Sequence, residues 1–195
     1  MKKWLPFITI AVIVVWAYGS IKGFNNTAVV YEEDAKTTWS NVESSYQRRT
    51  DLIPNLVATV KGYAAHESET LEAVIKARAA ATSTKIDAGN LSPEKMAQFQ
   101  KAQQGLSGAL GRLMVVAERY PDLKANTNFL ELQSQLEGTE NRINVERNRF
   151  NNGVNVYNKH IKIFPNSVFA GWLGFEEMAR YQAAEGSEKA PEVKF

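Results

Sequence analysis

The chain contains no cysteine among its 195 residues. A disulfide framework, a thiolate nucleophile and a thiolate metal site are therefore excluded, and the core must form by packing alone. No charge of one sign dominates, since 23 basic residues stand against 21 acidic ones. This balance lacks the one-sided basic surface that nucleic-acid binding needs, so we expect no nucleic-acid partner.

Motifs for catalysis and metal binding are also missing. The two histidines, His66 and His160, lie far apart in no ligand spacing, and no GxSxG, P-loop or dinucleotide fingerprint occurs. Di-metal sites in helical bundles use ExxH elements, and the sequence has none. We expect Glu146 to pair with Arg149 or Arg142 along a helix. We predict that the protein is not an enzyme and holds no cofactor and no metal.

A long apolar run lies near the N-terminus. No charged residue occurs from Trp4 to Ile21, and these 18 residues would extend about 27 Å as a helix, close to the ~30 Å hydrocarbon thickness. Trp16 and Tyr18 stand near one end, where aromatic rings prefer the membrane interface. We predict a single transmembrane anchor over residues 1–22, and hence the lipid bilayer as a partner.

The residues around this run indicate its orientation in the membrane and whether it is cleaved. Lys2 and Lys3 precede it and Lys22 follows it, which favours a cytoplasmic N-terminus and a C-terminal domain outside. The alternative is a cleaved signal peptide, with Ala17-Tyr18-Gly19 as a loosely matching cleavage site.

Apolar residues beyond a predicted linker at 23–27 recur at steps of three, four and seven, the period of a helix. They predict helices over about 28–50 and 51–82, the second capped by Asp51, with a break possible at 66–68. A third helix starts at Ser92-Pro93-Glu94 and stops at Tyr120-Pro121. A fourth, of roughly 36 residues, ends at Pro165.

We predict an all-α protein with an N-terminal transmembrane helix followed by an antiparallel up-down four-helix bundle over residues 28–165. In the alternative, the first two bundle helices are one helix kinked at Pro54, which leaves three long helices. Residues 166–185 are expected to form a membrane-proximal amphipathic segment, and the polar residues 186–195 a flexible tail. Three glycines in the third helix, Gly105, Gly108 and Gly111, predict a close helix approach.

An up-down bundle brings two of its turns together at the end far from the membrane. We predict a partner-binding tip there, with candidate residues Arg48, Arg49, Asp51, Asn55, Glu118, Tyr120, Lys124 and Asn126. The alternative is that these residues are caps and salt bridges that fix two tight turns.

The opposite end of the bundle returns to the membrane. Its candidate membrane-interface residues are Phe164, Phe169, Trp172 and Phe175. The alternative is that these aromatic residues close the open end of the bundle.

Residues 48–57 (RRTDLIPNLV) and 60–63 (VKGY) resemble the signature of the LemA family, and residues 118–126 (ERYPDLKAN), Tyr157-Asn158 and Phe164-Pro165 resemble its second half. The resemblance implies a membrane-anchored helical bundle of bacteria with no catalytic residues. Family members are often encoded near membrane metalloproteases, and a magnetosome membrane protein is among them.

The leading functional prediction is a membrane-tethered scaffold or adaptor that binds another protein at the cell envelope, with a membrane metalloprotease as a candidate partner. The competing prediction is a membrane-surface or membrane-shaping protein that acts by forming homo-oligomers.

Overall fold

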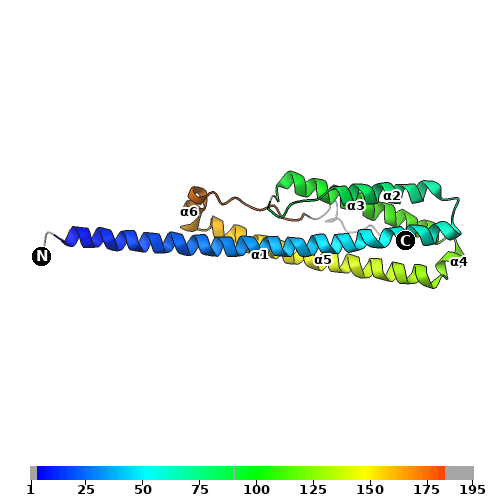
Figure 1. Cartoon of the computed structure of the whole chain (residues 1–195), viewed down its shortest axis with the longest axis horizontal. Helices are drawn as coiled ribbons and strands as arrows, with labels where there is room; N and C mark the ends of the chain where they lie inside the picture. Colours follow the sequence, from blue (N-terminus) through cyan, green and yellow to red (C-terminus); the bar gives the residue numbers. More distant parts are fainter. Residues whose placement is uncertain (1–3, 90, 183–195) are drawn as a thin grey trace, which may run out of the picture. The chain divides into compact units, whose positions relative to one another are not determined.

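The computed structural model describes residues 4–89 and 91–182. Helices account for most of these residues, and no strand occurs among them. The helices are α1 (Leu5–Tyr63), α2 (Ser68–Ser83), α3 (Pro93–Ala117), α4 (Pro121–Lys124), α5 (Thr127–Lys162) and α6 (Asn166–Leu173) (Figure 1). The predicted all-α class with an apolar N-terminal helix is confirmed. The predicted tail at 186–195 lies outside the described residues.

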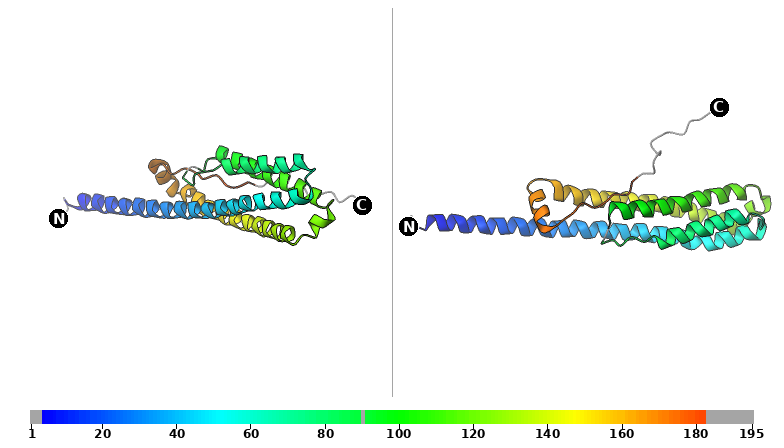
Figure 2. Two further views of the ribbon diagram at one scale, coloured as in Figure 1. Left: turned by 45° about the vertical axis from the view of Figure 1, so that its right-hand side comes forward. Right: turned by 90° about the horizontal axis from the view of Figure 1, so that it is seen from above.

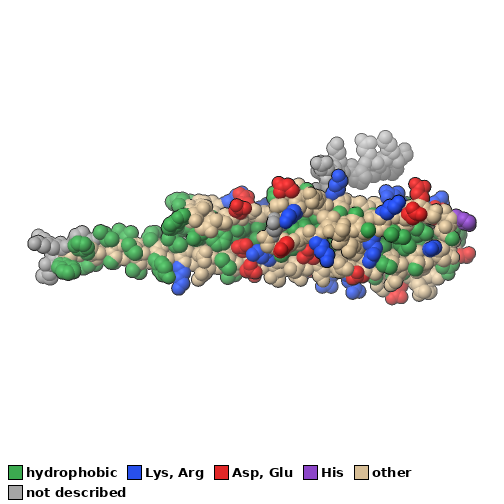
Figure 3. Space-filling view, turned by 45° about the horizontal axis from the view of Figure 1, so that its top comes forward, with side chains coloured by type: hydrophobic (Ala, Val, Ile, Leu, Met, Phe, Trp, Pro, Cys, Tyr) green, Lys and Arg blue, Asp and Glu red, His purple; other side chains and the backbone are tan. Residues whose placement is uncertain are grey.

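The N-terminal part of α1 carries the uncharged segment. Its large apolar side chains from Phe7 to Tyr18 are 58–72% exposed, and Figure 3 shows hydrophobic side chains covering this part of the helix. Among the described helices, α1 alone is long and apolar enough to cross a membrane. A run of exposed apolar side chains of this length matches the hydrocarbon of a bilayer.

The predicted linker at residues 23–27 is wrong, because α1 continues through it. Phe24 and Ala28 are buried there, and the Thr27 hydroxyl donates to the Gly23 carbonyl oxygen at 2.9 Å. Burial of an apolar helix face stabilises a helix more than the weak propensities of glycine and asparagine destabilise it.

The predicted boundary between two helices at residue 51 is also wrong. α1 passes through Pro54 and ends at Tyr63, so Asp51 lies inside the helix and is not an N-cap. Proline has no N–H, so it cannot donate to the Thr50 carbonyl oxygen four residues earlier. That oxygen accepts instead from Arg78 Nε of α2 at 3.0 Å. The alternative of one helix through Pro54 is right for this region. The break lies instead between Tyr63 and Ser68, where α2 begins, and it overlaps the predicted weak point at 66–68.

The chain divides into two compact units, whose described residues are 4–49, 87–89 and 137–178 (unit 1) and 50–86, 91–136 and 179–182 (unit 2). Unit 1 pairs the first part of α1 with the second part of α5 (Figure 2). Trp39 and Phe150 are fully buried with ring centroids 5.1 Å apart. The two helices lie close together at Gly153, where an added Cβ would make van der Waals contact with the Ala35 Cα at 3.4 Å.

Unit 2 is built around a core of apolar residues from five helices. The core includes Ile53, Leu56, Val60, Leu71, Val74, Leu106, Leu113, Leu123, Phe129 and Leu136. The predicted start of α3 is confirmed, since the Ser92 hydroxyl accepts from the Lys95 backbone N–H and Pro93 is the first helical residue. The predicted fourth helix corresponds to α5, which has 36 residues.

The close approach predicted at Gly105, Gly108 and Gly111 is wrong. All three glycines are exposed on α3. Apart from the nearby backbone of α3 itself, a Cβ at Gly105 or Gly111 would have no neighbour within 4 Å, and a Cβ at Gly108 would meet only an Arg112 nitrogen at 3.9 Å. Glycine spacing identifies a smooth helix face but does not say whether another helix packs on it.

Candidate functional site

The structure does not bring the eight predicted partner-binding residues together at one turn. Arg48, Arg49, Asp51 and Asn55 lie along α1, and the turn that follows α1 is formed by residues 64–67. The prediction placed them at a turn because a proline in the first turn and a proline inside a helix look alike in sequence.

Arg49 is part of the packing of unit 1. Its side chain is 4% exposed, and its Nη1 donates to a Glu140 carboxylate oxygen at 2.8 Å. The guanidinium also lies over the ring of Tyr46, with 5.0 Å between Arg49 Cζ and the ring centroid. Neighbouring Arg48 is exposed. The two arginines therefore differ in environment, and only Arg48 presents its charge to solvent.

The other four candidates lie around α4 in unit 2 and serve local structure. Asn126 caps α5, because its Oδ1 accepts from the Phe129 backbone N–H at 3.0 Å, and its Nδ2 donates to the Tyr63 hydroxyl at 2.9 Å. Lys124 pairs with Glu118. These contacts match the predicted alternative of caps and salt bridges, and their role in partner binding stays a prediction.

Tyr120 joins this turn to the loop after α1. Its hydroxyl donates to Glu67 Oε1 at 3.0 Å, and Arg119 Nη2 lies 3.2 Å from the same oxygen. The hydrogen bond to Glu67 raises the pKa of Tyr120 above its usual value. One carboxylate thus fixes two residues of the turn between α3 and α4.

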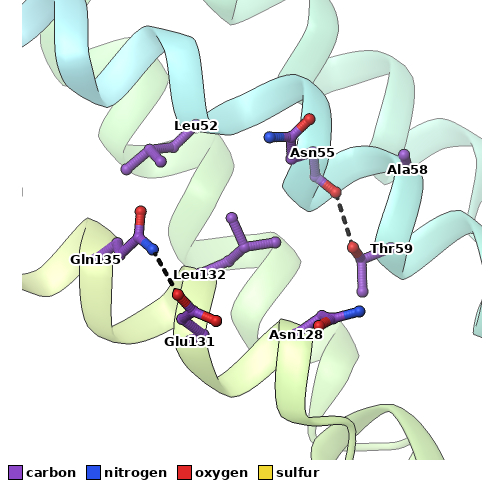
Figure 4. Close-up of a pocket in the computed structure, with 8 residues that line it drawn as sticks. All are labelled: Leu52, Asn55, Ala58, Thr59, Asn128, Glu131, Leu132 and Gln135. Atoms are coloured by element: carbon purple, nitrogen blue, oxygen red, sulfur yellow. Dashed lines mark hydrogen bonds between the residues drawn. The ribbon is translucent and has the colours of Figure 1, made fainter.

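A groove of about 440 Å³ lies between α1 and α5 within unit 2 (Figure 4). It is lined by Leu52, Asn55, Ala58, Thr59, Asn128, Glu131, Leu132 and Gln135. Leu52 and Leu132 are partly buried and also pack on the core of the unit. The leucines of the groove can contact an apolar group of a ligand, and the neighbouring amides and carboxylate can form hydrogen bonds with polar atoms next to that group.

Asn55 is the one predicted partner-binding residue that lines this groove. Among the described residues, the side-chain amides of Asn55 and Asn128 make no hydrogen bond, whereas the Gln135 amide donates to Glu131 at 3.1 Å. The prediction missed the α5 side of the groove. The spacing of residues 128, 131, 132 and 135 places them on one face of a helix. The sequence does not show that α1 lies opposite this face and forms the second wall of the groove.

The four predicted membrane-interface residues divide into two pairs in unit 1. Phe164 and Trp172 are 84% and 76% exposed. Phe169 and Phe175 turn toward α1, with ring centroids 5.8 and 5.6 Å from that of Phe24. The outward pair fits the predicted membrane contact, and the inward pair matches the alternative of closing the end of the bundle.

His160 belongs to the same aromatic cluster. Its ring stacks on Phe24 at 5.2 Å between centroids and meets Tyr31 edge to face at 5.3 Å. Asn166 Nδ2 donates to the His160 carbonyl oxygen at 3.0 Å, which ties the start of α6 to the end of α5. This histidine is thus a packing residue of unit 1.

The segment after α6 is held by two residues of α5 that are not among the predicted site residues. Asn158 Nδ2 donates to the Met178 carbonyl oxygen at 2.9 Å, and its Oδ1 accepts from the Met178 N–H at 3.0 Å. The Tyr157 hydroxyl donates to the Glu176 carbonyl oxygen at 2.9 Å. Burial raises the pKa of Tyr157 to about 12. Both residues could have been singled out from the sequence, because Tyr157-Asn158 is part of the family motif.

The described residues contain no group of three or more histidine, cysteine, aspartate or glutamate side chains that could hold a metal ion. The predicted pair of Glu146 and Arg149 is present, with 2.9 Å between Arg149 Nη1 and Glu146 Oε1. This pair is intrahelical, as expected, whereas Glu140 of the same helix pairs with Arg49 of α1.

Known proteins are similar to this chain over most of its length. The family model described as the LemA family matches residues 38–195. Magnetosome protein MamQ 2 of Paramagnetospirillum magneticum is 29% identical over 178 residues, which cover 80% of this chain and 64% of the relative. Magnetosome protein MamQ of Magnetospirillum gryphiswaldense is 29% identical over 174 residues, covering 78% and 62%. Protein LemA of Metamycoplasma hominis is 24% identical over 163 residues, covering 84% and 71%. The chain thus matches less than two thirds of the length of the two magnetosome proteins.

Proposed function

The chain belongs to the LemA family, and we propose that this membrane-associated helical protein is a scaffold whose groove between α1 and α5 binds a segment of another protein. The observation that carries the proposal is the make-up of the groove, in which two leucines lie beside amides without partners in the described chain. The apolar segment of α1 would tether the protein to the membrane.

The chemistry of the groove supports a polypeptide as the ligand. The Asn55 and Asn128 amides each offer a donor and an acceptor, which matches the backbone of a bound segment. Leu52 and Leu132 can contact one or two apolar side chains of that segment, as at the centre of a protein interface. A membrane metalloprotease is the partner class that the family resemblance implies.

Site-specific photo-cross-linking in native membranes tests the proposal. We would place a photoreactive residue at Asn55 in the full chain and, as a control, at Lys76, which is a highly exposed position of α2 in the same unit. The expected result is a discrete adduct with a different protein at Asn55 only. Equal adducts at both positions, or none at Asn55, would refute the groove as the binding surface.

A second function, self-association at the membrane surface, is favoured by the exposed aromatic side chains of Phe164 and Trp172 in unit 1. The same experiment separates the two functions. Adducts made only of two copies of this chain would favour self-association.

A further inference from the structure

We propose that α6 is a second membrane anchor, which lies in the plane of the bilayer and inserts Phe164, Val168 and Trp172 into the boundary between lipid headgroups and acyl chains. This inference concerns unit 1 and is independent of the groove in unit 2. The proposed partner of α6 is the lipid itself.

The residues of α6 and its flanks divide into two faces. Phe164, Val168 and Trp172 follow one another at steps of four, and they are 84%, 61% and 76% exposed. Ala170 is buried, and Phe169 packs with it in the cluster around Phe24. The chain has no charged residue between Lys162 and Glu176. An exposed apolar face that includes a tryptophan and no charged residue suits the membrane interface.

Phe24 sets the depth of α6 relative to the apolar segment of α1. It lies three residues beyond Ile21, the last residue of the uncharged segment, or about 4.5 Å farther along the continuous helix. The polar interface of a bilayer is about 5–8 Å thick on each side. Because α6 packs around Phe24, it lies at the depth of the headgroups on the side where α1 leaves the membrane.

The orientation of α6 also agrees with a position in the membrane interface. In Figures 1 and 2, α6 runs across α1 and not along it. If α1 spans the bilayer, α6 is then close to parallel with the membrane surface, so that one face can meet lipid along its whole length.

The C-terminal end of α6 determines which of its aromatic neighbours lies inside and which lies outside. Gly174 adopts a left-handed conformation with φ of 78°, and the Phe175 N–H donates to the Ala170 carbonyl oxygen at 3.0 Å. This arrangement ends the helix and reverses the chain. Phe175 therefore returns to Phe24, whereas Trp172 remains outside.

Spin labelling tests the proposal directly, because the natural chain has no cysteine to remove. The variant Val168→Cys of the full chain would be labelled and reconstituted in phosphatidylcholine vesicles. The matched control is Val156→Cys, since Val156 is also an exposed valine, 47% exposed, on α5 of the same unit. Power saturation then compares collisions with oxygen, which concentrates among acyl chains, and with a water-soluble nickel chelate.

We expect the label at 168 to collide several-fold more with oxygen than with the chelate, and the label at 156 to show the reverse. A label at 172, in Trp172→Cys, should behave like that at 168. Water accessibility at both 168 and 172 would overturn the proposal. Protection of both labels from both reagents would also overturn it, because a protein surface and not lipid would then cover the face.

Discussion

Replacing Arg78 by methionine should destabilise the protein, because Arg78 supplies the hydrogen bond that Pro54 removes from α1. The Thr50 carbonyl oxygen accepts from Arg78 Nε at 3.0 Å, and Thr50 is only 5% exposed. Methionine keeps much of the aliphatic stem but has no donor. A buried acceptor left without its partner costs about 1–3 kcal/mol, which is the expected loss in the free energy of unfolding.

The cause can be isolated with the variant Pro54→Ala. Alanine restores the N–H at position 54, which can donate to the Thr50 carbonyl oxygen, and it removes a residue that costs about 3 kcal/mol inside a helix. Pro54 is exposed, so this change leaves no cavity. In the Pro54→Ala background, Arg78→Met should cost much less than in the natural chain. The difference between the two costs is the coupling energy of the pair.

Urea unfolding of the full chain in detergent micelles, followed by helical circular dichroism, measures these energies. The matched control is Arg112→Met, because Arg112 is an exposed arginine of α3 and its replacement should change stability by less than about 0.5 kcal/mol. Equal costs of Arg78→Met in both backgrounds would show that the hydrogen bond does not compensate for the proline.

Three further predictions concern single residues. Arg49→Ala should lower the free energy of unfolding by about 1.5–3 kcal/mol, because it removes a buried charged donor. Arg48→Ala should lower it by less than about 0.5 kcal/mol, because Arg48 is exposed. Urea unfolding of the two variants measures both losses. Asn158→Asp keeps the acceptor but loses the donor to the Met178 carbonyl oxygen, so hydrogen exchange at the Met178 amide should become faster, and unchanged exchange would contradict the role of Asn158. The pKa of Tyr157 is raised to about 12 from an ordinary value of about 10, so its contribution to stability should be complete below pH ~10 and lost as the pH rises through the folded value. Stability measured against pH should fall less steeply in this range for Tyr157→Phe than for the natural chain.

The helical period sufficed to predict the long elements of the fold. α5 repeats its apolar residues over ten turns, and the start of α3 carries a serine cap, a proline and an acid in order. Such signals are local, so a single sequence contains them in full. The absence of charge from Trp4 to Ile21 likewise identified the apolar segment.

The course of α1 could not be read from local signals. Pro54 ends a helix unless another group satisfies the Thr50 carbonyl oxygen, and that group comes from Arg78, 28 residues later. The break at 23–27 was predicted for a similar reason, since the burial of Phe24 depends on α6 and the end of α5. The division of the four aromatic residues into inward and outward pairs also depends on this packing, because composition cannot say which side of α6 faces α1.

The uninterrupted helix between the apolar segment and Phe24 connects the thickness of the bilayer with the angle of α6. A transmembrane helix leans over when the hydrocarbon is thinner than its apolar length and stands upright when the hydrocarbon is thicker. No flexible joint separates Ile21 from Phe24, so α6, which packs on Phe24, must lean by the same angle. One end of its apolar face then sinks as the other rises. In lipid, unit 1 would act as a gauge that converts hydrophobic mismatch into the depth of an aromatic side chain.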